Sequence, residues 1–189
     1  MALDVDDLAE FLNVTFKDTE VDGQVVPDPR RRELAEHLEA AVATVEARTG
    51  PVWQREVSYT VRSINGLLVL PATHLTEIAM VLGPAGEVGM DTFIPGHVDK
   101  HSGLIYLPAG NPEGPYVVTV TAGEENPPAD LVRAVLYVAG HLWESQRGRS
   151  QRPGVLGEDR TGGAPAWAIP YTAQTLMEPY LLPLDARSA

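Results

Sequence analysis

Apolar residues recur every three or four positions in two long segments, and this period predicts two amphipathic helices. The first helix is expected to have Asp28 as its N-cap, Pro29 as its first residue and Gly50 at its end. Pro127 and Pro128 precede the second, which is expected to end near Gly148. The expected buried stripes are Leu34, Leu38, Ala41, Val42 and Val45 in the first helix, and Leu131, Val135, Leu136, Val138, Ala139 and Leu142 in the second.

Two shorter helices are expected near the ends of the chain. Leu3, Leu8, Phe11 and Leu12 predict a short N-terminal helix, and several aspartates precede or open it, where negative charge suits the helix dipole. Residues 172–178 are expected to form one short helix within a proline-interrupted segment. Residues 13–27 show no helical period and are predicted to be a loop.

Between the two long helices the apolar period changes to two, which is typical of strands. Val57, Tyr59 and Val61 alternate with polar residues up to Asn65–Gly66, a dipeptide that predicts a tight turn and a hairpin. Further short strands are expected at residues 67–70, 75–82, 104–107 and 116–121, separated by glycine and proline. The pattern predicts a small antiparallel sheet or barrel-like region inserted at about residues 53–122.

After residue 148 the composition shifts to arginine, glycine, serine and proline, which is typical of a mobile linker. The predicted fold class is therefore α+β: a small α-helical bundle with an inserted antiparallel β region and an extended C-terminal tail. We expect residues 1–147 to form the body, and residues 148–189 to form a flexible linker and a docking tail.

Composition excludes several classes of function. The 189 residues include no cysteine, which removes disulfides, thiolate catalysis and zinc–thiolate sites. The formal net charge of -12 argues against tight binding of duplex nucleic acid, which needs clustered basic side chains. The acidic excess lies in the first two thirds of the chain, whereas residues 127–189 hold equal numbers of acids and bases. An acidic N-terminus and the lack of a long apolar run predict a soluble, unexported protein.

The sequence contains no recognisable catalytic motif, and we predict no enzyme activity, cofactor or metal. Gly83, Gly86 and Gly89 are spaced three residues apart, but we interpret them as turn glycines rather than as a phosphate-binding loop. His97 and His101 flank Asp99 at a metal-like spacing, but the neighbouring prolines and glycines predict a loop rather than a helix. A small metal-dependent enzyme using this loop remains an alternative. His141 is interpreted as a helix-face or interface histidine rather than a catalytic base, and His37 and His74 as similarly isolated.

Two features are not explained by burial within the chain itself: the arginine-rich segment and the apolar tail after it. Mobile linkers followed by aromatic residues typically end in a partner's groove, and Trp, Tyr and Arg are favoured in interfaces. The residues expected to bind a partner are Arg147, Arg149, Arg152, Trp167, Tyr171, Leu176, Met177, Tyr180 and Leu181. A small interaction module that regulates an assembly without becoming part of it is a further alternative.

The order of several short segments resembles a known family. These segments are EARTG at 46–50, LLVLP at 67–71, VTVTAG at 118–123, PPADLVRAVL at 127–136, ESQR at 144–147 and the late pair PY at 179–180. In this order they resemble the head-to-tail connector proteins of long-tailed bacteriophages, also called adaptor or head completion proteins. The resemblance covers most of residues 3–184.

The resemblance implies a structural virion protein without enzyme activity, assembled in the host cytoplasm and located at the head–tail interface. Such proteins form a homo-oligomeric ring, commonly a dodecamer, beneath the portal protein. Their opposite face receives the next head-completion or tail-terminator protein. The resemblance also implies that the C-terminal segment docks into the portal and that the ring lines the DNA conduit. Acidic residues facing such a lumen would let DNA pass without specific binding.

Overall fold

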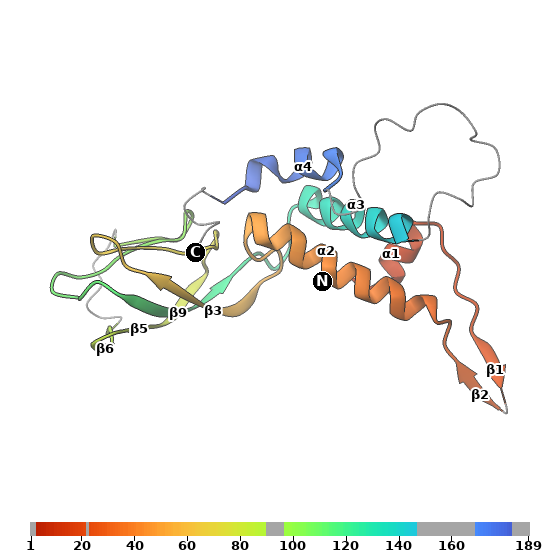
Figure 1. Ribbon diagram of the computed structural model, residues 1–189, viewed down its shortest axis with the longest axis horizontal. Coiled ribbons are helices and arrows are strands. Elements are labelled where there is room, and N and C mark those ends of the chain that lie inside the picture. Colours follow the sequence, from red (N-terminus) through yellow and green to blue (C-terminus); the bar gives the residue numbers. More distant parts are fainter. Residues whose placement is uncertain (1–2, 22, 90–96, 147–168, 183–189) are drawn as a thin grey trace. The chain divides into compact units, whose positions relative to one another are not determined.

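A computed structural model of the chain describes residues 3–21, 23–89, 97–146 and 169–182. Within these residues the fold is α+β, with four α-helices and three small antiparallel sheets, as the sequence predicted (Figure 1). The chain divides into two compact units. The helical unit comprises residues 1–45 and 128–179, and the β unit comprises residues 46–127 and 180–189. Among the described residues no helix is long and apolar enough to cross a membrane.

The helical unit is built from α1 (Val5–Phe11), most of α2 (Arg30–Thr49), α3 (Ala129–Gln146) and α4 (Tyr171–Met177). Asp4 caps α1, accepting hydrogen bonds from the N–H groups of Asp6 and Asp7, while the Asp7 carboxylate accepts from Asp4 N–H. Asp28 caps α2 through a 3.0 Å hydrogen bond from Arg30 N–H, and α2 ends before Gly50, whose φ is +79°. The predicted ends of the first long helix are thus confirmed.

The core of the helical unit is formed by the predicted apolar stripes. The buried members are Leu34, Leu38, Ala41 and Val45 of α2, and Leu131, Val135, Val138 and Ala139 of α3. Val42, Leu136 and Leu142 are only half-buried. Trp143 is buried on α3, where its indole meets the His37 ring edge-to-face at 6.0 Å. His37 is therefore a core residue of this unit.

One prediction for this unit is wrong: residues 13–27 are not a loop throughout. They contain β1 (Thr19–Val21) and β2 (Gln24–Val26), which pair as an antiparallel hairpin. Gly23 has a φ of +76°, the left-handed conformation that a two-residue hairpin turn requires. The strands are too short for a period of two to show in the sequence, but the Asp22–Gly23 dipeptide is a hairpin signal.

The β unit contains two antiparallel sheets. One has the order β3-β9-β5-β6, and the other has the order β4-β8-β7. The strands are β3 (Arg55–Arg62), β4 (Leu67–Val69), β5 (Glu77–Gly83), β6 (Gly86–Glu87), β7 (Val98–Asp99), β8 (Leu104–Tyr106) and β9 (Pro115–Ala122). The predicted strands therefore exist, within a few residues of their expected bounds. After β9 the chain returns to the helical unit through Pro127 and Pro128.

The hairpin expected at Asn65–Gly66 is correct as a turn and wrong as a strand pairing. Asn65 and Gly66 have φ values of 53° and 76°, and Ile64 and Leu67 exchange two hydrogen bonds of 3.0 Å across the turn. The pairing stops there, because β3 continues in the sheet with β9 while β4 pairs with β8 in the other sheet. The turn therefore connects two sheets.

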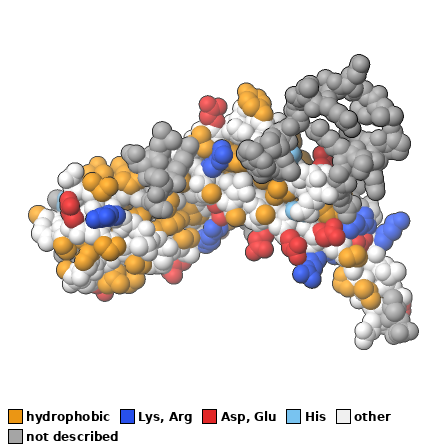
Figure 2. Space-filling view, viewed as in Figure 1, with side chains coloured by type: hydrophobic (Ala, Val, Ile, Leu, Met, Phe, Trp, Pro, Cys, Tyr) orange, Lys and Arg blue, Asp and Glu red, His pale blue; other side chains and the backbone are white. Residues whose placement is uncertain are grey.

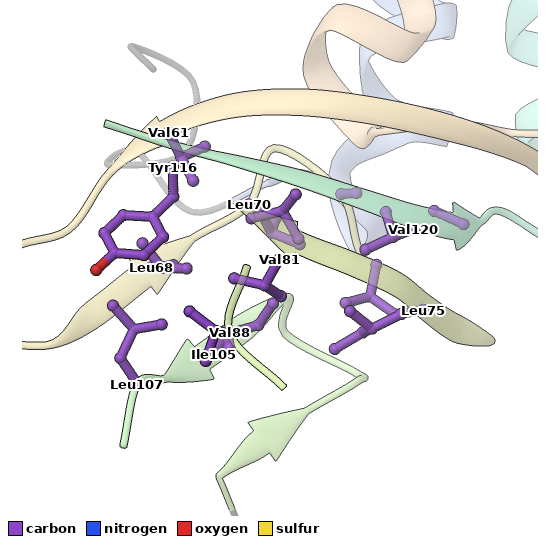
Figure 3. Close-up of a cluster of buried hydrophobic side chains, with 14 residues drawn as sticks. Val61, Leu68, Leu70, Leu75, Val81, Val88, Ile105, Leu107, Tyr116 and Val120 are labelled. Carbon is purple, nitrogen blue, oxygen red and sulfur yellow. The ribbon is translucent and has the colours of Figure 1, made fainter. Parts of the chain in front are cut away.

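A cluster of buried apolar side chains from both sheets forms the core of the β unit (Figure 3). Tyr116, Val118, Val120 and Ala122 alternate along β9 and are fully buried, as the period of two predicts. The Tyr116 ring lies so close to Gly83 that an added Cβ would be 2.2 Å from the ring, and the Tyr116 hydroxyl donates to Pro112 O at 2.7 Å. Glycine at position 83 thus makes room for the ring.

Candidate functional site

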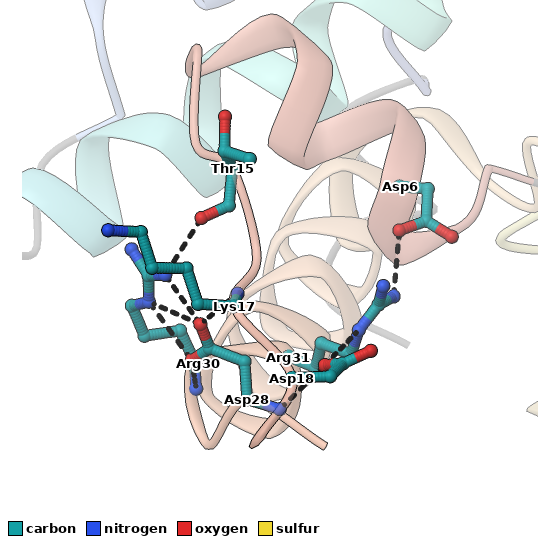
Figure 4. A network of polar contacts seen from close by, with 7 residues as sticks. All are labelled: Asp6, Thr15, Lys17, Asp18, Asp28, Arg30 and Arg31. Atoms are coloured by element: carbon teal, nitrogen blue, oxygen red, sulfur yellow. Dashed lines mark hydrogen bonds and ion pairs between the residues drawn. The ribbon is translucent and has the colours of Figure 1, made fainter. Parts of the chain in front are cut away.

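A group of arginine and aspartate side chains fixes the segment that leads into the hairpin (Figure 4). Asp28 is 5% exposed and accepts hydrogen bonds from Lys17 N–H at 2.8 Å and from the Arg30 side chain. The Arg30 guanidinium and the Lys17 N–H hold the pKa of Asp28 well below its usual range. Arg30 Nη2 also donates to Thr15 O at 2.8 Å. The stretch before β1 is therefore tied to the start of α2.

A second arginine continues this group toward α1. Arg31 Nη1 pairs with Asp6 Oδ1 at 2.8 Å, and its guanidinium carbon lies 4.1 Å from the centre of the Phe16 ring. The Asp18 carboxylate accepts from Asp28 N–H at 3.0 Å and lies 3.8 Å from Arg31 Nε. These carboxylates are engaged by hydrogen-bond donors and guanidinium groups, so the group holds the chain in place rather than presenting a free acid or base. We call Asp6, Lys17, Asp18, Asp28, Arg30 and Arg31 the root cluster.

The hairpin above the root cluster is exposed. All three residues of β2 are solvent-exposed; Val25 is 70% exposed and Val26 46%. Apolar side chains are visible on the surface of this hairpin in Figure 2. The described part of the chain does not bury these two valines, and contact with a partner would remove them from water.

The β unit carries a shallow depression of about 600 Å³ that brings together side chains distant in sequence. His74 and His101 line it, with their rings edge-to-face and 4.8 Å apart. Lys100 also lines it and donates to Thr76 O at 2.6 Å, while Glu124 and Glu125 contribute carboxylates. The interpretation of His74 as an isolated histidine is therefore wrong: its backbone turns at a φ of 55°, and its N–H donates to His101 O at 3.4 Å.

The turn that carries His101 is built by Asp99. The Asp99 carboxylate accepts from the Ser102 hydroxyl, from Ser102 N–H at 3.3 Å and from His101 N–H at 3.0 Å, and these bonds lower its pKa. As predicted, His97 and His101 are not on a helix. Among the described residues no group of three or more His, Cys, Asp or Glu side chains is placed to hold a metal ion. The carboxylate of Asp99 thus serves the turn.

The residues predicted to bind a partner are only partly described. Arg147, Arg149, Arg152 and Trp167 lie outside the described residues. Tyr171, at the start of α4, is 84% exposed, whereas Met177 is fully buried where α4 packs on α3. The other three, Leu176, Tyr180 and Leu181, are half-buried. Their assignment to a partner stays a prediction, with Tyr171 the most accessible of those described.

Sequence reasoning missed two features that the fold creates. The root cluster joins residues up to 25 positions apart, and only the capping role of Asp28 was visible in the sequence. His74 and His101 meet because Leu70 N–H, His74 N–H and Leu75 N–H bond to the turn at 100–103. No local pattern indicates either meeting.

No protein-family model matches the chain, and a search of curated proteins finds no match. Solved structures do match its fold. A chain in the neck of an empty gene transfer agent (GTA) particle, computed with C6 symmetry, superposes with a TM-score of 0.57 at 20% identity. That match covers 96% of this chain and 90% of the other.

Two further matches come from related particles. A chain of the virion of a native GTA particle gives a TM-score of 0.53 at 21% identity, covering 96% of this chain and 90% of that one. A chain in the neck of a native GTA particle, computed with C12 symmetry, gives a TM-score of 0.53 at 21% identity. That match covers 89% of this chain and 96% of the other. The protein therefore shares its α+β fold, over nearly its whole length, with chains of phage-like particles.

Proposed function

We propose that the protein is a structural component of the neck of a phage-like particle, where it acts as the head-to-tail connector. The observation that carries this proposal is the fold match to neck chains of GTA particles, which spans 89–96% of this sequence. The order of sequence segments that resembles phage connectors supports it independently. The role is architectural, and it requires no catalytic residue.

In this proposal copies of the chain form a ring between the portal protein and the next head-completion or tail-terminator protein. The C6 and C12 symmetries of the matching necks support a ring in which each copy contacts its neighbours through two different surfaces. The protein is then assembled in the host cytoplasm and resides in the virion, at the head–tail interface.

The acidic charge suits a conduit for DNA. The chain carries a net charge of -12, and acidic residues are exposed along the helical unit, among them Asp4 and Glu10 of the α1 region and Glu39 of α2. If such carboxylates face the lumen, they repel phosphates and give DNA no counterion-release gain on contact. DNA then passes without specific binding. A lumen lined mainly by arginine would contradict this part of the proposal.

The C-terminal segment is proposed to dock into the portal. The test is co-purification of the protein with the portal protein of its own particle, comparing the full chain with a chain ending at Gln146. Because Met177 packs on α3, truncation also removes core contacts, so a point variant is needed. We expect Tyr171→Ser to weaken portal binding, since this ring is 84% exposed and its loss leaves the fold intact.

The matched control is Tyr106→Ser, which removes another exposed tyrosine, 45% exposed, from the β unit. Portal binding that is lost with Tyr171→Ser and kept with Tyr106→Ser supports docking through the C-terminal segment. Equal binding by the full chain, the truncated chain and both point variants would refute that assignment.

A further inference from the structure

Strand β3 leaves one edge of its sheet open. It pairs with β9 over all eight residues and with no other strand of the described residues. Ser63 N–H donates to Gly114 O at 2.9 Å, so Ser63 and Gly114 form a hydrogen-bonded pair. Along an antiparallel ladder, hydrogen-bonded pairs alternate with pairs that exchange no hydrogen bonds. Ser58 and Thr60 therefore direct their N–H and C=O groups away from β9. Among the described residues, these outward-facing backbone groups have no strand to pair with.

The centre of the open edge lacks the usual protection against strand addition, since the charged residues of β3 lie at its ends. Its central residues, VSYTV at 57–61, include no charge, proline or glycine, and these residue types favour strands. The side chains of Ser58 and Thr60 are exposed, and no bulge interrupts the β3–β9 register. Natural sheets rarely leave such an edge uncovered. The edge is suited to receive a further strand.

The hairpin of β1 and β2 is suited to supply that strand. Within the described part of the chain it is a separate two-stranded sheet, so the outer edge of β2 has no partner strand there. A short isolated hairpin is marginal in water, but here the root cluster fixes its base through charge-assisted hydrogen bonds. A segment that is held in its binding conformation before contact loses little entropy on docking.

We propose that the β1–β2 hairpin of one copy adds strand β2 to the free β3 edge of a second copy, extending the four-stranded sheet. The two strands match in character, because QVV at 24–26 is as uncharged as the centre of β3. Their flanks are complementary: Glu20 lies on the hairpin, opposite Val25, and Arg62 ends β3 without an ion pair among the described residues.

This inference rests on the proposed function, since a ring requires repeated contacts between two different surfaces of the same chain. Strand addition supplies such a contact, with main-chain hydrogen bonds giving affinity and Val25 and Val26 giving apolar contact. The same contact, repeated around a closed ring, leaves no hairpin and no β3 edge unpaired.

The absence of cysteine makes cross-linking a direct test. Val25→Cys chains are mixed with tagged Ser58→Cys chains and mildly oxidised, and the disulfide-linked products are separated by mass. We expect the mixed product to exceed both self-linked products several-fold. The control mixture pairs Val25→Cys with Glu144→Cys, an exposed position on α3. Dominant Ser58–Ser58 linkage would indicate β3-to-β3 pairing and would overturn the inference, as would no excess over the control.

A second measurement uses sedimentation velocity of the full chain. Val25→Asp places a charge in the proposed contact, and we expect it to weaken self-association about tenfold or more, while Val25→Thr changes it little. Because Val25 is 70% exposed, both variants should keep the wild-type circular dichroism spectrum and melting temperature. Unchanged association in Val25→Asp, or no association of the wild-type chain, overturns the inference. The ring proposal is judged separately, by whether particles contain the protein.

Discussion

Gly103 gives the sharpest test of the packing in the β unit. It ends the turn between β7 and β8 with a φ of +72°, its N–H donates to Asp99 O, and its carbonyl accepts from Leu70 N–H at 3.0 Å. A Cβ at this position would lie 2.0 Å from Ala72 O, which belongs to a fully buried residue. Gly103→Ala therefore forces the turn at 100–103 away from the segment at 70–72.

The magnitude follows from two separable costs. A positive φ costs a non-glycine residue about 1–2 kcal/mol, and relieving the clash costs about 1–3 kcal/mol more, in overpacking and in the strained Leu70–Gly103 hydrogen bond. The expected loss in free energy of unfolding is about 2–5 kcal/mol. Gly66→Ala is the matched control, because Gly66 has a φ of +76° with nothing within 4 Å of an added Cβ. It should cost only the first term, about 1–2 kcal/mol.

The assay is urea unfolding of both variants, followed by circular dichroism and by tryptophan fluorescence. Gly103→Ala should lower the unfolding midpoint clearly more than Gly66→Ala, with the same slope for the β-unit transition. The two variants share the conformational penalty and differ in the space around the methyl group. Equal destabilisation by the two substitutions would refute the close approach of the turn to Ala72.

Three further outcomes follow from the charges and the phenols. Asp28→Asn should lower the free energy of unfolding near neutral pH. Because the folded-state pKa of Asp28 is lowered, the difference in free energy of unfolding between wild type and variant should shrink as the pH falls below about 4 in an unfolding series. Burial raises the pKa of Tyr59 to about 12. The stability that its neutral phenol contributes should therefore be fully present below about pH 10 and should be lost between about pH 10 and 12. The ultraviolet signal of phenolate formation should appear over the same pH range. Glu46→Gln, which breaks a pair with Arg55, should cost about 1–2 kcal/mol in urea unfolding, whereas Glu36→Gln on the exposed face of α2 should cost less than about 0.5 kcal/mol.

The helices could be predicted because their signals are local. Asp28 and Pro29 open α2 and Gly50 follows its last residue, so the cap, the period and the stop all lie within the segment itself. The strands of the β unit were also visible from their period of two. Their partners were not, since β9 lies between β3 and β5 and this order depends on contacts between distant residues.

The missed hairpin and the missed side-chain groups have one cause. Strands of three residues are too short to show a period, and the Asp28 contacts with Lys17 and Asp18 depend on how residues 13–18 return to α2. His74 meets His101 because residues 70–75 bond to a turn that lies far away in the sequence, at 100–103. Of the predicted partner-binding set, the sequence could indicate apolar character but not burial: Met177 is in the core and Tyr171 is at the surface.

The central claim is that the protein is a stoichiometric part of a particle's neck. The most direct measurement is quantitative mass spectrometry of purified, DNA-filled particles, with the portal protein as the internal standard. The account predicts that the protein is present in one small ring, in the range of six to twelve copies set by the symmetry of the matching necks. Absence from purified particles, or hundreds of copies in each, would contradict it.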